Sequence, residues 1–217
     1  MDRAGIPFVS VPLFMSGVLF AFDIWWGGAG CGFLGVCLAL FFRDPNRKVL
    51  SSAENNAILA PADGKVVHAG KVEVAAEPDE PGEWSQISIF LSPLDVHVNR
   101  TPVGGRVIGV RHKRGRFLPA YHKLSAVDNE RCEIVIDHNG QHIIFRQVVG
   151  ILARRVVCRI KPGMTVERGQ RFGIMKFGSR MDIYLPLSAK LHASVGDVVR
   201  GGETVLATLV DSSALDS

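Results

Sequence analysis

The pair Gly178-Ser179 lies between two apolar runs, in the stretch IMKFGSRMDIYLP at residues 174–186. A serine hydroxyl attacks a carbonyl only when a neighbouring base takes its proton. The chain contains seven histidines that are candidates for this base. Most Gly-Ser pairs between strands are ordinary turns, so the chemistry of this pair depends on the residues around it.

Lys176 indicates a different chemistry two residues before the glycine. A lysine at the tip of a hairpin between two similar half-barrels resembles the modified lysine of biotin and lipoyl carrier domains. A carrier needs neither an apolar anchor nor further strands upstream, and this chain has both patterns. Two alternatives to an enzyme therefore stay open, namely a membrane-tethered carrier modified at Lys176 and a non-catalytic membrane protein whose β domain is a binding module.

Composition argues against several other classes of site. The four cysteines form no CxxC pair, so we expect no disulfide framework and no metal site. The net charge is +4, and the densest basic run, residues 111–116, lacks the interleaved aromatic residues of a single-strand-binding surface. An anionic membrane or lipid headgroup suits this charge at least as well, and we expect no nucleic-acid partner.

From residue 57 onward, short β-branched runs alternate with glycine, proline and asparagine. The segment DHNGQH, at residues 137–142, stands between two apolar runs and predicts a hairpin whose turn is Asn139-Gly140. Helical periodicity is weak throughout this part of the chain. We therefore predict a mainly β domain of about ten strands.

An internal repeat places the serine within this domain. The segments that begin at Gly163 and Gly196 match at an offset of 33 residues, and each reads as turn, strand, glycine turn and strand. Two such hammerhead-like half-barrel units would form a flattened β-barrel or sandwich. Gly178-Ser179 lies in the segment that connects them, where a rigid scaffold can hold a reactive group.

Residues 6–42 are apolar except for Asp23, which divides them into pieces of 17 and 19 residues. As helices these pieces would be roughly 25 to 29 Å long, close to the hydrocarbon thickness of a bilayer. Trp25 and Trp26 are typical of an interfacial anchor. We predict a membrane-anchoring helical hairpin at residues 1–42, followed by a catalytic β domain at residues 43–217.

The topology of this hairpin has two readings, a spanning hairpin and a shallow re-entrant one. The basic segment RDPNRK, at residues 43–48, indicates that the β domain lies on the cytoplasmic side in either case. A buried core hairpin in a soluble domain is the competing interpretation of the same apolar run.

Five motifs occur in one order along the chain: FFRDPNR (41–47), APADGKV (60–66), SPLDVHVNRTPVGG (92–105), NER (129–131) and FGSR (177–180). Together they resemble the short form of the phosphatidylserine decarboxylases, over about residues 38–210. The resemblance implies a pyruvoyl-dependent carboxy-lyase of phospholipid biosynthesis. Such an enzyme is made as a zymogen and converts phosphatidylserine to phosphatidylethanolamine and CO₂.

The resemblance also implies how the cofactor forms. The Ser179 hydroxyl attacks the Gly178 carbonyl, and autocatalytic cleavage gives a β chain, 1–178, and an α chain, 179–217. Residue 179 becomes a pyruvoyl group, which forms a Schiff base with the substrate amine and replaces pyridoxal phosphate as electron sink. The resemblance further implies a homodimer at the cell membrane, with no pyridoxal phosphate and no metal.

The same motifs suggest partners for the serine. His97 stands in the D-x-H segment and is the expected base; with an ordinary pKa near 6.5 it could also donate a proton at neutral pH. Asp63, in P-x-D-G, would orient the imidazole. Longer family members have a second histidine where this chain has Arg100, so the division of the two steps stays open. The candidates for substrate contacts are Arg100, His122 and Arg180.

Overall fold

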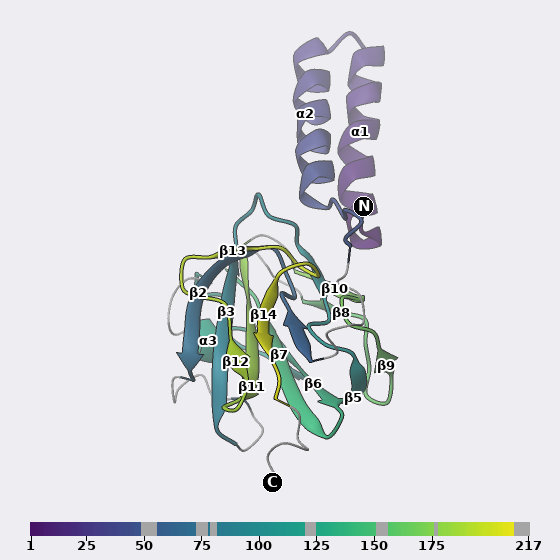
Figure 1. Ribbon diagram of the computed structural model, residues 1–217. Coiled ribbons are helices and arrows are strands. Elements are labelled where there is room, and N and C mark those ends of the chain that lie inside the picture. Colours follow the sequence, from purple (N-terminus) through teal and green to yellow (C-terminus); the bar gives the residue numbers. More distant parts are fainter. Residues whose placement is uncertain are drawn as a thin grey trace, which may run out of the picture.

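We analysed a computed structural model of the chain, which describes residues 1–48, 56–72, 78, 82–119, 125–150, 156–175 and 178–210. The fold is mainly β, with antiparallel sheets and two N-terminal helices that stand beside each other above the sheets (Figure 1). The predicted fold class is confirmed at this level.

The N-terminal helices form the predicted hairpin. A short 3-10 helix, η1 (Arg3–Gly5), leads into α1 (Ile6–Ala21), and α2 (Trp25–Phe41) returns beside it. Asp23 makes the turn with a φ of 58°. At 1.5 Å per residue, α1 and α2 are about 24 and 26 Å long. By length and composition, the stretch Arg3–Ala21 is able to cross a membrane, whereas α2 is shorter.

Glycines let the two helices approach closely. A Cβ atom at Gly35 would lie 2.6 Å from Cδ2 of Leu13, and one at Gly28 would lie 2.8 Å from the ring of Phe20. The Ser16 hydroxyl also donates a hydrogen bond of 2.7 Å to the carbonyl of Gly28. The helices therefore pack through small residues and leave most of their large apolar side chains exposed.

The β domain contains strands that pair into three antiparallel sheets, with one short helix, α3 (Ser125–Asp128). The largest sheet has the order β13-β2-β3-β11-β7-β6-β5-β9, and the two three-stranded sheets have the orders β1-β14-β12 and β4-β10-β8. The strands are β1 (Ala57–Leu59), β2 (Gly64–Lys71), β3 (Trp84–Leu91), β4 (Val98–Arg100), β5 (Gly105–Lys113), β6 (Arg131–His138), β7 (Gln141–Val148), β8 (Val157–Cys158), β9 (Thr165–Val166), β10 (Arg171–Ile174), β11 (Ser179–Pro186), β12 (Lys190–Leu191), β13 (Val198–Val199) and β14 (Val205–Thr208).

The main core lies on one face of the large sheet. Alternate residues of its central strand β11, namely Met181, Ile183 and Leu185, belong to this core. The residues between them face the opposite side, where Arg180 and Asp182 are also buried. Because a strand alternates faces, Ser179 shares the core face with Met181.

The predicted turn at Asn139-Gly140 is confirmed. Both residues have positive φ, 53° and 83°, and they join β6 to β7 with His138 opposite Gln141. Asparagine and glycine tolerate this left-handed backbone better than other residues, which explains why the sequence signalled this hairpin clearly.

The hairpin rests directly on the β domain. Phe42 is fully buried and clusters with Phe41 and Val9 against Val96, Val98 and Ile174. Near the N-terminus, Asp2 pairs with Arg159 at 2.7 Å. The first 42 residues therefore include part of the packed interface with the β domain.

Candidate active site

Gly178-Ser179 lies at the start of β11, in the connection from β10. Gly178 has a φ of 64°, a left-handed conformation, although a Cβ atom there would contact nothing within 4 Å. Glycine suits the position for its backbone freedom, not for lack of space. Ser179 is fully buried, and its hydroxyl oxygen has no hydrogen-bond partner among the described residues. A buried hydroxyl without a partner is uncommon and marks this serine as a functional candidate.

His97 is also fully buried. Its Nδ1 lies 2.9 Å from the backbone carbonyl of Asp95. Since a carbonyl only accepts, Nδ1 must carry the proton, and in the neutral ring Nε2 is then an acceptor. This Nε2 has no partner among the described residues. The site thus contains one unpaired buried donor, the Ser179 hydroxyl, and one unpaired buried acceptor.

Two backbone contacts place these atoms in the same region. Ser179 is paired with Leu91, the last residue of β3. Four residues before the serine, the Met175 N–H donates a 3.3 Å hydrogen bond to the carbonyl of His97. Leu91 and His97 are six residues apart in the chain, and the partner of each is a residue close to the Gly178-Ser179 bond, so His97 and Ser179 lie at the same end of the fold.

The end of α2 covers the histidine. The ring of Phe41 lies 4.1 Å from the ring of His97, between centroids, at an interplanar angle of 34°. Burial, with a smaller contribution from the positive charge of Arg43, lowers the pKa of His97 to about 4. The prediction of an ordinary pKa near 6.5 is therefore wrong, and the imidazole stays neutral well below pH 6.5.

Asp63 does not make the predicted contact that would orient the imidazole of His97. Its carboxylate accepts hydrogen bonds from Arg47, at 2.7 Å, and from the backbone N–H of Gly201, at 2.8 Å. The Nδ1 atom of His97 is bonded to Asp95 instead. Asp63 therefore ties the segment after α2 to the turn near Gly201, and no direct hydrogen bond to His97 is made.

Arg100 is buried and already has partners. Its guanidinium donates hydrogen bonds to the carbonyls of Gly169 and Pro45, at 3.1 and 3.2 Å, and lies 3.4 Å from Asp44. Burial lowers the pKa of this arginine. Its contacts join the segment after α2 to the turn at Gly169, between β9 and β10.

The other predicted site residues fall outside this cluster. Arg180 faces the side of the sheet opposite to Ser179, where it contacts Asp182 at 2.5 Å and Ser88 at 3.0 Å. His122 and Lys176 lie outside the described residues.

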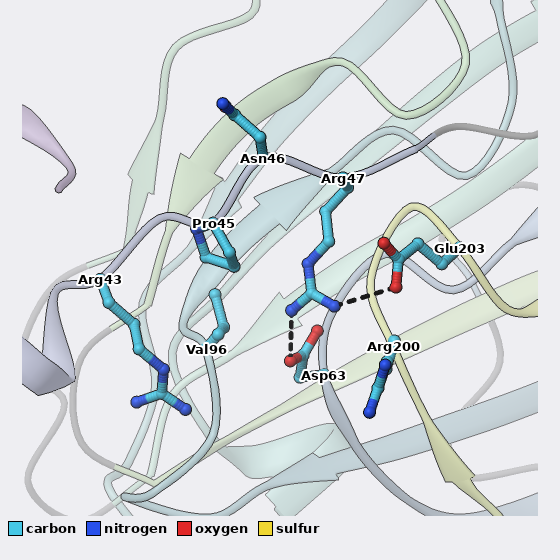
Figure 2. A pocket seen from close by; sticks show the side chains of 8 residues that line it. All are labelled: Arg43, Pro45, Asn46, Arg47, Asp63, Val96, Arg200 and Glu203. Atoms are coloured by element: carbon cyan, nitrogen blue, oxygen red, sulfur yellow. Dashed lines mark hydrogen bonds and ion pairs between the residues drawn. The ribbon is translucent and has the colours of Figure 1, made fainter.

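A pocket of about 430 Å³ opens where the segment after α2 enters the β domain, and one of its lining residues, Val96, directly precedes His97 in the sequence. Figure 2 shows the Arg47 guanidinium within it, joined to Asp63 and to Glu203. The pocket is lined by Arg43, Pro45, Asn46, Arg47, Asp63, Val96, Arg200 and Glu203.

Sequence reasoning assigned no role to several of these residues. Phe41 and Arg43 stand in the FFRDPNR motif that helped to indicate the family, and Arg200 and Glu203 stand in the second repeat unit. Their contribution depends on contacts between segments far apart in the chain, such as Phe41 with His97 and Arg47 with Glu203, which no local pattern reveals.

Comparisons with known proteins show the family of the chain. The family described as phosphatidylserine decarboxylase matches residues 34–207. Proteins named phosphatidylserine decarboxylase proenzyme are similar over most of their length: one from Wolbachia pipientis wMel is 40% identical over 96% of this chain and 91% of its own. One from Anaplasma phagocytophilum (strain HZ) is 42% identical over the same shares. One from Salinibacter ruber is 47% identical over 76% of this chain and 73% of its own. The chain belongs to the phosphatidylserine decarboxylase family.

Proposed function

We propose that the protein is a self-processing phosphatidylserine decarboxylase that forms phosphatidylethanolamine and CO₂. The observation that carries the proposal is the pair of unpaired buried atoms, the Ser179 hydroxyl and Nε2 of His97, in a chain of this family. One atom has a proton to give, and the other has a lone pair to accept it.

In the proposed processing step, Nε2 of His97 takes the proton as the Ser179 oxygen attacks the Gly178 carbonyl. The peptide bond becomes an ester, and elimination then separates the chain into residues 1–178 and 179–217. The left-handed backbone at Gly178 supports this attack, because it turns the peptide out of the regular strand geometry. Hydrolysis of the dehydrated residue releases ammonia and leaves a pyruvoyl group at position 179.

The residues present fit such a group. Ser179 is buried on the core face, and its Oγ has no hydrogen-bond partner among the described residues. Pyruvoyl formation removes this oxygen and turns the Cβ into a buried methyl group, so the loss of Oγ would break no hydrogen bond to a described residue. When formed, the pyruvoyl group supplies a carbonyl that binds the substrate amine and accepts the electrons released with CO₂. The proposal requires neither pyridoxal phosphate nor a metal.

His97 serves the second reaction through the same nitrogen. A substrate ammonium must lose a proton before it can react, and the neutral Nε2 can take that proton. The imidazolium then returns it to the carbon that loses CO₂. The low pKa of about 4 favours this return, because a histidine that binds protons weakly also releases them readily. Asp63 acts on this histidine only indirectly, through Arg47 and the segment after α2.

We also propose a membrane attachment for the hairpin and a half-barrel arrangement for the two repeat units. The exposed apolar hairpin supports attachment to the cell membrane, and the basic residues that follow it support a cytoplasmic β domain. In the two repeat units, Gly163, Gly169, Gly196 and Gly202 all have positive φ, which supports paired half-barrels. A homodimer remains a prediction from the family resemblance.

The activity test uses full-length protein in detergent micelles that contain phosphatidylserine labelled in the serine carboxyl. We expect labelled CO₂ and phosphatidylethanolamine from the wild type and neither product from Ser179→Ala. If fully processed wild-type protein released no labelled CO₂, the assigned reaction would be wrong.

A further inference from the structure

The pocket that Val96 lines carries positive charge that the protein does not neutralise. Three guanidiniums and two carboxylates line it. Arg47 is bonded to both carboxylates, Asp63 at 2.7 Å and Glu203 at 3.1 Å. Arg47 and the two carboxylates together carry one negative charge, and Arg43 and Arg200 give the lining a net charge of +1.

These two arginines differ from the buried arginines elsewhere. The guanidinium of Arg43 donates to the carbonyls of Leu40 and Leu94, at 2.8 and 2.6 Å, and these carbonyls have no net charge. The Arg200 side chain makes no hydrogen bond or ion pair within the described part of the chain. In Figure 2 both line the same pocket as the neutralised Arg47. The pocket therefore presents unneutralised donors to an anion.

The position of the pocket narrows the class of anion. Arg43 is two residues after the end of α2, whose apolar side chains are exposed as for a membrane anchor. Val96, adjacent to His97, forms part of the wall. A ligand here would lie at the base of the anchor and next to the catalytic histidine, where the headgroup of a membrane lipid would enter.

We infer that Arg43 and Arg200 bind the phosphodiester of the phosphatidylserine headgroup. Guanidinium groups match phosphate oxygens in charge and geometry. In this headgroup the phosphate is followed by one methylene and then by the carbon that bears the amine and the carboxylate. Holding the phosphate in the pocket places that carbon toward His97. This inference rests on the proposed function and replaces the earlier candidates Arg100 and Arg180, whose guanidiniums are engaged within the protein.

The binding test uses full-length Ser179→Ala proenzyme, so that it does not depend on activity. Calorimetry compares glycerophosphoserine, which contains the phosphodiester, with free serine, which does not. We expect Arg200→Gln to weaken glycerophosphoserine binding about tenfold or more, as for the loss of a charge-assisted contact. Serine binding should be unchanged. Arg43→Lys keeps the positive charge but loses the planar, two-pronged guanidinium. It should therefore weaken binding less than Arg43→Gln, which loses both.

Arg106→Gln is the matched control, because Arg106 is exposed, lies outside the pocket and has no ion pair among the described residues. It should bind glycerophosphoserine like the parent. In processed enzyme, Arg200→Gln should raise KM for phosphatidylserine about tenfold or more while the chain is still fully cleaved.

Sedimentation with phosphatidylglycerol vesicles tests whether the arginines bind the substrate headgroup or the anionic surface of the membrane. Arg200→Gln should sediment like the wild type. If it loses vesicle binding but keeps its affinity for glycerophosphoserine, the arginines bind the membrane surface and the inference is wrong. Unchanged glycerophosphoserine binding in both Arg43→Gln and Arg200→Gln would also overturn it. A wild type that binds glycerophosphoserine but releases no CO₂ would refute the proposed function alone.

Discussion

At the residue scale, burial decides what His97 can do. The ring is fully buried against Phe41, and desolvation lowers its pKa to about 4. A solvent-exposed histidine would be partly protonated at pH 6 to 7, and its protonated fraction could not accept a proton from Ser179. Burial therefore keeps the Nε2 atom of His97 unprotonated throughout the physiological pH range.

The rate of self-processing should follow the neutral fraction of His97. We expect the rate constant to be flat between pH 6 and 8 and to be half-maximal near pH 4. Stopped time courses on a denaturing gel, with protein synthesised in vitro, measure this rate. His97→Gln should remain uncleaved at every pH. A midpoint near pH 6.5 would show that the imidazole is solvated during the reaction.

The same pKa predicts how stability depends on pH. The unfolded chain, with a histidine pKa near 6.5, binds more protons than the folded chain between pH 6.5 and about 4. Stability from this group therefore falls as pH falls through that window. At about 1.4 kcal/mol per pH unit, the loss is roughly 3 kcal/mol. Urea unfolding of Ser179→Ala should show this slope, and the slope should be reduced when His97→Gln is added.

Asp63 and Arg47 should be energetically coupled. Their side chains are 16% and 10% exposed. Removing one of them would therefore leave the charge of the other partly buried and with fewer partners. We expect a coupling of about 1 to 3 kcal/mol in a double-mutant cycle of Asp63→Ala and Arg47→Ala, measured by urea unfolding. If the two single effects add up to the double effect within about 0.5 kcal/mol, the interaction between Asp63 and Arg47 does not contribute to the free energy of unfolding.

At the element scale, α2 is both a part of the anchor and a wall of the site. Its last residue, Phe41, is 7% exposed and covers His97, whereas Phe33 in the same helix is 74% exposed. The base of the hairpin therefore packs as part of the β domain, although its residues are as apolar as those of the rest of the hairpin.

Phe41→Ala should raise the pKa of His97 toward 6.5, because water reaches the ring. It should also lower the free energy of unfolding by about 3 kcal/mol, as for a buried phenylalanine. The processing midpoint should then move up in pH. Phe33→Ala is the control and should change neither quantity. An unchanged midpoint in Phe41→Ala would show that other groups exclude water from His97.

The same packing changes what a truncation is expected to do. Deleting residues 1–42 removes Phe41 and Phe42 and exposes their partners Val96 and Ile174. Loss of these contacts should impair folding of the β domain, so we do not expect processing to stay intact. Replacing only residues 12–35 with a short flexible linker keeps the base of the hairpin. We expect the shortened chain to process normally in the soluble fraction and the full deletion to process slowly.

At the scale of the whole molecule, the tip of the hairpin points away from the β domain (Figure 1). Trp26 at the tip is 93% exposed, and Asp23 makes the turn there. The helices, about 24 and 26 Å long, approach the roughly 30 Å thickness of a hydrocarbon core. A charged residue followed closely by two tryptophans is stable in an interface and costly at the bilayer centre.

We therefore expect the tip to reach the far interface. Brominated lipids in vesicles should quench tryptophan fluorescence most when the bromines lie close to the headgroups. The double change Trp25→Phe and Trp26→Phe is the control, since it leaves only the buried Trp84 as a fluorophore. Strongest quenching by bromines at the ends of the acyl chains would indicate a re-entrant hairpin.

The sequence predicted those features that depend on local patterns. Alternation and turn residues indicated the β domain and the Asn139-Gly140 turn, and the apolar run split at Asp23 indicated the helical hairpin. It did not predict that Phe41 would cover His97 or that Asp63 would pair with Arg47. Both contacts join segments whose approach is set by the packing of the hairpin on the sheets, and neither leaves a periodic signal.

Intact mass spectrometry of the purified protein shows whether Ser179 cleaves its own chain. We expect two chains, residues 1–178 and 179–217, and a carbonyl at the start of the shorter chain that borohydride traps. Ser179→Ala should give one chain of full mass. A single full-length wild-type chain, with or without biotin or lipoate at Lys176, would rule out self-cleavage, as would cleavage of the Ser179→Ala protein at the same bond.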